Sequence, residues 1–167
     1  MKIQGKVWKF GDHVDTDLII PARYLNDSNK EVLATRCFRD LRPGFPSQVA
    51  SGDIVVAGKN FGCGSSREQA AWAIKGTGIS VVIAESFARI FYRNAFNIGL
   101  PLLESTEATQ VLEEGDQVQV DLDSGRISRL QGTESFMAEP IPDFMQDLVR
   151  AGGLVPYIQS QKERRAG

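Results

Sequence analysis

The sequence predicts an α/β fold in which a sheet with mixed strand directions is flanked by helices. Residues 53–57 and 79–84 are short β-branched runs with the length of buried strands. Between them, residues 68–75 are rich in helix formers, and residues 87–97 form a second predicted helix. The run over 79–84 is apolar throughout, which favours a strand covered on both faces and parallel to the strand before it. The centre of the chain therefore has a β-α-β-α pattern.

The remaining elements place β-rich segments on either side of this centre. In chain order we expect a strand over 5–10, helices over 30–41 and 106–113, a β-hairpin from 117–122 and 126–130, a strand at 136–137, and a helix that opens at 142 and closes at 152–153. No repeat or linker divides the chain. We expect one domain over residues 1–167, with residues 160–167 frayed.

Composition excludes several classes of protein. The 167 residues carry a formal net charge of −2, which gives no reason to expect a nucleic-acid or acidic-membrane partner. No apolar run reaches the length of a membrane span, and the polar start of the chain does not look like a signal peptide. Two cysteines and one histidine are too few for a disulfide framework or a His-based metal site, so we expect a cytoplasmic protein that binds no metal itself.

A glycine-rich turn follows the strand at 53–57. Gly62 and Gly64 permit backbone conformations that a Cβ atom would hinder. Ser65 begins an S-x-x-E sequence and Ser66 an S-x-x-Q sequence, and both patterns are typical of a capping box at a helix start.

Arg67 adds a guanidinium group to this predicted helix start. Unpaired N–H groups and the positive end of the helix dipole favour anions, and a guanidinium group suits a carboxylate or phosphate. A well-capped helix without a ligand explains the same residues. The pattern is neither G-x-G-x-x-G nor a P-loop, so nucleotide binding is not indicated.

Other charged residues have simpler explanations when taken alone. Asp12 and Asp15 fit a solvated turn in which short side chains bond the backbone. Arg89 and Arg93 are four residues apart on one predicted helix, and we interpret them as a solvated or ion-paired face.

Three motifs together resemble a known family. They are Val14-Asp15-Thr16-Asp17-Leu18-Ile19-Ile20-Pro21-Ala22-Arg23-Tyr24-Leu25, Asn60-Phe61-Gly62-Cys63-Gly64-Ser65-Ser66-Arg67-Glu68 and Ser86-Phe87-Ala88-Arg89-Ile90-Phe91-Tyr92-Arg93-Asn94. In this order they resemble the small subunits of the isopropylmalate isomerase and homoaconitase group, the separate-chain version of the aconitase swivel domain. The resemblance implies a swivelling β/β/α domain that closes over a large subunit carrying a 4Fe–4S cluster, in a heterodimer or heterotetramer.

The resemblance also implies a reaction, the removal and re-addition of water on a hydroxy acid with two or three carboxylates. The cluster iron takes the hydroxyl group, while a serine alkoxide removes a proton next to a carboxylate. By match to the family's motifs, Ser65 is that base, Ser66 and Arg67 hold a substrate carboxylate, and Asp17 supports the active site. Cys63 is not implied as a cluster ligand.

Substrate choice in this family is associated with the loop after Tyr24-Leu25. Homoaconitase-like members tend to carry arginine there, whereas this chain has Asn26, with Arg23 nearby as a further candidate for substrate binding. We therefore expect interconversion of 2- and 3-isopropylmalate in leucine biosynthesis. The alternatives are homoaconitate or dimethylmalate as substrate, a non-catalytic anion-binding module, and a redox protein based on Cys63. Gln69, where many relatives have histidine, leaves the substrate open.

Overall fold

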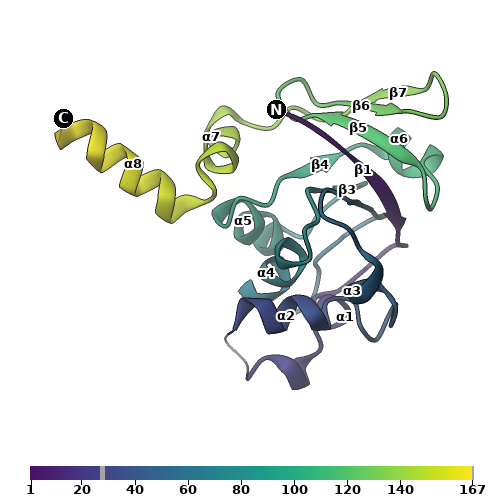
Figure 1. Cartoon of the computed structure of the whole chain (residues 1–167), viewed down its shortest axis with the longest axis horizontal. Helices are drawn as coiled ribbons and strands as arrows, with labels where there is room; N and C mark the ends of the chain where they lie inside the picture. The colour runs from purple at the N-terminus through teal and green to yellow at the C-terminus, as the bar shows by residue number, and fades with distance from the viewer. Residues whose placement is uncertain (27–28, 167) are drawn as a thin grey trace.

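The computed structural model describes residues 1–26 and 29–166. Within these residues seven strands form one sheet in the order β4-β3-β2-β1-β5-β6-β7 (Figure 1). The strands are β1 (Lys2–Lys9), β2 (Ile54–Val56), β3 (Val81–Ala84), β4 (Leu102–Glu104), β5 (Gln117–Asp121), β6 (Arg126–Arg129) and β7 (Ser135–Met137). The helical elements are α1 (Thr16–Ile19), the 3₁₀ turn η1 (Ala22–Tyr24), α2 (Lys30–Arg36), α3 (Phe45–Gln48), α4 (Glu68–Gly76), α5 (Arg89–Asn97), α6 (Thr106–Val111), α7 (Asp143–Ala151) and α8 (Leu154–Ala166).

One half of the sheet is parallel and comprises β4, β3, β2 and β1. Val7 of β1 pairs with Ile54 of β2, which pairs in turn with Val81 of β3. Every residue of β2 and β3 is buried, as the continuous apolar runs predicted. Helix α4 connects β2 to β3 and α5 connects β3 to β4. The predicted parallel pairing and its two helical connections are confirmed.

The other half of the sheet is antiparallel. It begins at β1, which pairs antiparallel with β5, from Lys2 opposite Asp121 to Lys6 opposite Gln117. The predicted hairpin is formed by β5 and β6, and β7 pairs with β6 as the outer strand. Along β5 buried residues alternate with less buried ones, as expected for a strand with one face on the core. β1 is thus the strand at which parallel pairing changes to antiparallel pairing.

Aromatic side chains pack the early loops against the rest of the core. Phe38 stacks on Phe10 with ring centroids 4.4 Å apart, and it meets Phe45 edge-on at 5.1 Å. Phe61, in the loop after β2, meets Phe91 of α5 at 5.3 Å. All five rings are buried, so the loops after β1 and β2 are anchored by the core.

The structure differs from the sequence prediction at two helices near the start of the chain. α2 ends at Arg36, not at residue 41, because Cys37 is extended and Phe38 has a positive φ of 55°. This conformation turns the Phe38 ring into the core, where it is completely buried. The predicted polar turn contains the short helix α1, whose first turn is capped by Asp15 accepting from the Leu18 N–H at 2.8 Å.

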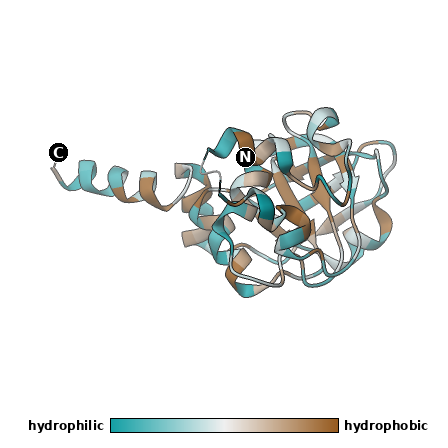
Figure 2. Cartoon of the chain, turned by 90° about the horizontal axis from the view of Figure 1, so that it is seen from below, coloured by the Kyte–Doolittle hydropathy of each residue, from teal (hydrophilic) through white to brown (hydrophobic). Residues whose placement is uncertain are grey.

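The end of the chain is a helix that extends away from the sheet. Residues 160–166, which we expected to fray, continue α8 as a regular helix. Its first turn packs on α7, where Tyr157 meets Phe144 at 5.5 Å between ring centroids. Beyond that contact α8 projects from the body of the molecule (Figure 2). No residue of α8 is buried.

Replacing Gly62 by alanine should destabilise the fold. Gly62 has φ +83°, and an added Cβ would overlap the ring of Phe91. We expect Gly62→Ala to lower the free energy of unfolding by about 2–4 kcal/mol, measured by urea unfolding of the purified chain. Gly115→Ala is the control, because Gly115 has φ +85° but open space around its Cβ position. It should cost about 1–2 kcal/mol. Equal losses of unfolding free energy in the two variants would show that overlap with the Phe91 ring does not contribute to the destabilisation.

Candidate functional site

The functional residues predicted from the sequence lie in loops at one edge of the sheet. β1, β2 and β3 are parallel, so their carboxyl ends meet at this edge. The loop after β1 contains Asp17, and the loop after β2 contains residues 65–67. The loop after β3 leads to Arg89, the first residue of α5. Ligand sites in open α/β sheets are commonly found at the carboxyl ends of the strands.

Backbone hydrogen bonds tie the first two loops together. The N–H of Gly62 donates to the carbonyl of Val14 at 2.8 Å, and the N–H of Thr16 donates to the carbonyl of Cys63 at 2.9 Å. The Thr16 hydroxyl donates to the carbonyl of Ser65 at 2.8 Å. The main chain at Ser65 is therefore held by the loop after β1, although Ser65 itself is exposed.

The second and third loops are joined in the same way. Phe61 forms an isolated parallel bridge with Phe87. Its N–H donates to the carbonyl of Ser86 at 3.0 Å, and its carbonyl accepts from the N–H of Ala88 at 2.9 Å. The Ser86 hydroxyl accepts a further bond from the N–H of Asn60 at 2.8 Å. The starts of α4 and α5 are thereby held side by side.

A cavity of about 280 Å³ lies between these two helix starts. The side chains that line it include those of Ser65, Ser66, Arg67, Arg89, Ile90 and Asn94. Three of the residues expected at the site are brought together here. Arg89 and Asn94 are additions, since the sequence pattern alone suggested only a charged helix face for Arg89. Their place at the site could have been inferred from the third motif together with the strand order.

The start of α4 is open and lacks the predicted capping boxes. Arg67 occupies the N-cap position in extended conformation, and no side chain caps the helix. Ser65 and Ser66 precede the N-cap position and neither hydroxyl caps the helix, so both predicted capping boxes are wrong. Within the described residues, the backbone N–H groups of residues 64–69 donate no hydrogen bond. Free N–H groups at the start of a nine-residue helix favour an anion.

Asp17 holds the guanidinium group of Arg67. Nη1 of Arg67 donates to Oδ1 of Asp17 at 3.0 Å and to the carbonyl of Ile20 at 3.3 Å. The Arg67 side chain is 17% exposed, whereas that of Asp17 is 63% exposed and also accepts from the N–H of Ala22 at 3.0 Å. The hydrogen bond from Arg67 lowers the pKa of Asp17, with a smaller contribution from the Ala22 N–H. Asp17 contacts Arg67, which lines the cavity, but does not line the cavity itself.

Arg23 and Asn26 do not line the cavity. Arg23 forms a two-pronged ion pair with Asp40, with N–O distances of 2.7 and 2.5 Å, and its guanidinium lies 4.5 Å from the centre of the Tyr24 ring. Asn26 is exposed in the loop that follows η1. The two residues after it lie outside the described part of the chain.

The two cysteines are separate in the fold. Cys37 is completely buried, and burial raises the pKa of its thiol. Cys63 is partly exposed in the loop after β2. Among residues 1–26 and 29–166, no three His, Cys, Asp or Glu side chains are grouped so that they could hold a metal ion. None of the helices described is long and apolar enough to cross a membrane.

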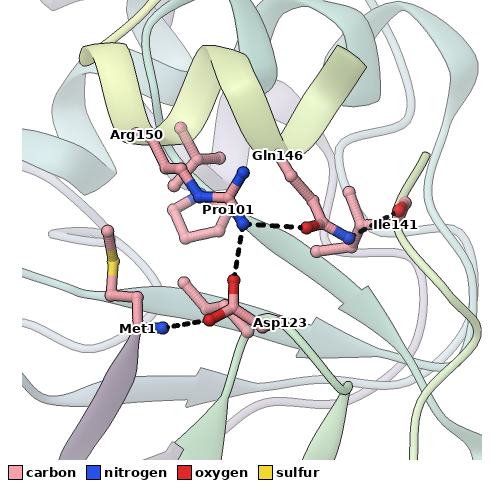
Figure 3. A pocket seen from close by; sticks show the side chains of 8 residues that line it. Met1, Pro101, Asp123, Ile141, Gln146 and Arg150 are labelled. Atoms are coloured by element: carbon pink, nitrogen blue, oxygen red, sulfur yellow. Dashed lines mark hydrogen bonds and ion pairs between the residues drawn. The ribbon is translucent and has the colours of Figure 1, made fainter. Parts of the chain in front are cut away.

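A second hollow, of about 10 Å³, lies between α7 and the β5–β6 turn (Figure 3). Its charges are already paired, because Asp123 accepts from the amino group of Met1 at 2.5 Å and from Nη2 of Arg150 at 2.8 Å. The Gln146 amide donates to the carbonyl of Ile141 at 3.0 Å. A space of this size holds about one water molecule, so this hollow is not a candidate site for a small-molecule ligand.

Comparison with known proteins agrees with the fold. The family model of the aconitase C-terminal domain matches residues 45–107. The 3-isopropylmalate dehydratase small subunit of Thermodesulfovibrio yellowstonii is 56% identical over 161 residues, covering 96% of both chains. The 2,3-dimethylmalate dehydratase small subunit of Eubacterium barkeri is also 56% identical, over 98% of this chain and all of that one. The crystal structure of 3-isopropylmalate dehydratase from Methanocaldococcus jannaschii superposes with a TM-score of 0.95 at 45% identity and covers 99% of this chain and 98% of that one.

These similarities place the protein in the class that has the aconitase C-terminal domain fold. The chain belongs to the family of 3-isopropylmalate dehydratase small subunits. The resemblance inferred from the three motifs is thus confirmed, as is the α/β fold expected from it. A dehydratase small subunit is one component of a lyase that works together with a large subunit.

Removing the Arg67 charge should raise the pKa of Asp17. The folded-state pKa of Asp17 is lowered, so its ionised form favours folding above the unfolded pKa, and this contribution disappears as pH falls through the folded pKa. We expect Arg67→Gln to move the pKa of Asp17 upward, measured by NMR titration of the side-chain carboxyl carbon. The pKa of Asp40, lowered by Arg23, is the internal control and should stay unchanged. An unchanged Asp17 pKa would contradict the ion pair.

Proposed function

We propose that this chain is the small subunit of a two-chain hydro-lyase that interconverts 2- and 3-isopropylmalate by dehydration and rehydration, in the leucine pathway of the cytoplasm. One observation carries the proposal. The cavity brings Ser65, Ser66 and Arg67 to the open start of α4, where an acid with carboxylate groups finds hydroxyls, free N–H groups and a cation. The family relationship supplies the reaction class that this chemistry suits.

Ser65 is the proposed base. Its Oγ takes the proton from the carbon next to a substrate carboxylate during dehydration and returns a proton during rehydration. A serine hydroxyl is a very weak acid in water, so its alkoxide requires stabilisation by N–H donors and nearby positive charge. The unbonded N–H groups of residues 64–69 and the guanidinium of Arg67 provide both on the same wall of the cavity.

Ser66 and Arg67 are the proposed binding group for one substrate carboxylate. A guanidinium group can donate two parallel hydrogen bonds to a carboxylate. One nitrogen of Arg67, Nη1, is already bonded to Asp17 and Ile20. Asp17 therefore acts as a positioning residue, because it fixes the orientation of Arg67 without lining the cavity.

The 4Fe–4S cluster of this enzyme class does not fit the side chains of this subunit. Cys37 is fully buried, Cys63 has no second cysteine beside it, and no metal-ligand group occurs among the described residues. We therefore assign the cluster to the large subunit, where it would bind the substrate hydroxyl. The residues of this chain contribute proton transfer and carboxylate binding.

The Eubacterium barkeri relative supports a second candidate substrate, 2,3-dimethylmalate. Both candidates are malates with alkyl substituents, and the cavity wall includes Ile90, whose side chain is 46% exposed. An exposed apolar side chain is a better contact for an alkyl group than for a third carboxylate. This favours either substituted malate over homoaconitate. The choice between the two malates requires direct comparison.

Ser65→Ala should greatly slow turnover without preventing assembly. We expect kcat/KM to fall by about 10²–10⁴-fold, the usual contribution of a positioned acid or base. The measurement is anaerobic reconstitution with the cluster-bearing large subunit and parallel assays with isopropylmalate, dimethylmalate, homoaconitate and citrate. Complex formation is followed by size-exclusion chromatography.

Ser47→Ala is the control for this experiment, because Ser47 is an exposed serine of α3 outside the cavity. It should behave as the unsubstituted chain. Full activity in Ser65→Ala would remove Ser65 as the base. Lack of turnover of all four acids by the unsubstituted complex would contradict the proposed reaction.

Asp17→Ala should weaken substrate binding more than it slows the chemical step. Without its carboxylate partner, Arg67 loses a fixed orientation, and we expect KM to rise by about tenfold with a smaller change in kcat. Asp40→Ala is the matched control, because Asp40 is a similarly exposed aspartate paired with Arg23. A larger effect from Asp40→Ala would instead assign carboxylate binding to Arg23.

A further inference from the structure

Arg89 differs from Arg67 and Arg23 in having no partner among the described residues. Arg67 is paired with Asp17, and Arg23 is paired with Asp40. Arg89 is exposed on the wall of the same cavity, and it makes no ion pair or side-chain hydrogen bond with any residue that the structure describes. A guanidinium group has five N–H donors, so Arg89 retains its full capacity to bind an anion.

The charged side chains that line the cavity are positive. Among the described residues that line the cavity, two are arginines and none is acidic. Arg67 is on one side, at the start of α4, and Arg89 is on the other, at the start of α5. No side chain caps α5, and the backbone N–H groups of residues 89–91 donate no hydrogen bond within the described chain. The cavity thus offers two cationic groups to a ligand with two negative charges.

Arg93 provides a comparison on the same helix. It lies one turn beyond Arg89, is exposed, and also has no partner among the described residues. Arg93 does not line the cavity. Arg93 therefore fits the interpretation as part of a solvated helix face. Arg89 differs from it because it lies on the cavity wall.

We propose that Arg89 binds the second carboxylate of the substrate, opposite the carboxylate held by Ser66 and Arg67. This inference rests on the proposed function, because it assigns a role within the same site. The substrate would span the cavity with one carboxylate near each helix start. Such an arrangement selects a dicarboxylate over a monocarboxylate, and it fixes the carbon chain between the two anchors next to Ser65.

The test uses the complex reconstituted with the large subunit, with Arg89→Gln, Arg89→Lys and the matched control Arg93→Gln. Substrate KM is measured alongside inhibition constants for the two regioisomeric monoamides of the substrate, each of which lacks one carboxylate charge. We expect Arg89→Gln to raise KM for the dicarboxylate about 10–100-fold, the effect of losing one charge-assisted hydrogen-bonded contact. Arg89→Lys should restore part of the affinity, and Arg93→Gln should change nothing.

The monoamides identify the carboxylate involved. For Arg89→Gln, the inhibition constant of one monoamide should stay near that of the unsubstituted complex, while that of the other rises with KM. An equal loss for both monoamides, an unchanged KM, or weakened assembly with the large subunit would overturn the role of Arg89. Failure of the proposed function is distinct, because it would appear as no turnover by the unsubstituted complex or as full activity in Ser65→Ala.

Discussion

The hydrogen bonds between three adjacent loops are the constraint on which the site depends. β1, β2 and β3 end at one edge of the sheet, and the loops that follow are joined through Val14, Gly62, Phe61 and Ala88. These bonds use main-chain atoms, so they position the start of α4 and the start of α5 without occupying the side chains between them. Ser65, Arg67 and Arg89 are left available for a ligand.

This arrangement requires unusual backbone conformations in the loops. His13 and Asn60 have φ values of 54° and 57°, in the left-handed region that side chains other than glycine adopt rarely, and Gly62 and Gly64 lie there as well. Such residues persist where surrounding contacts determine the conformation. The N–H of His13 donates to the carbonyl of Lys59 at 2.7 Å, and the buried ring of Phe61 anchors the same loop. Tertiary contacts hold the loops in these conformations.

The sequence predicted those features that depend on local pattern. The continuous apolar run at 79–84 predicted a buried parallel strand, and alternation at 117–122 predicted the hairpin. The capping boxes failed because S-x-x-E is compatible with more than one helix start. The Ser65 carbonyl accepts from the Thr16 hydroxyl of the opposite loop, and the helix begins at Glu68. Arg89 could not be separated from Arg93 by spacing alone. Their difference depends on strand order, which brings the start of α5 beside α4.

On the proposed function, the exposure of the site explains why catalysis is divided between two chains. Ser65 and Arg89 are exposed in this subunit, where water would solvate the serine and screen the arginine charge. A large subunit that covers the cavity would exclude this water and strengthen the interaction of free N–H groups and cations with an alkoxide or a carboxylate. The same closure would bring substrate to the metal cluster. Ser65 would therefore become an effective base only in the assembled enzyme, which confines proton abstraction to the complex that can also remove the hydroxyl group.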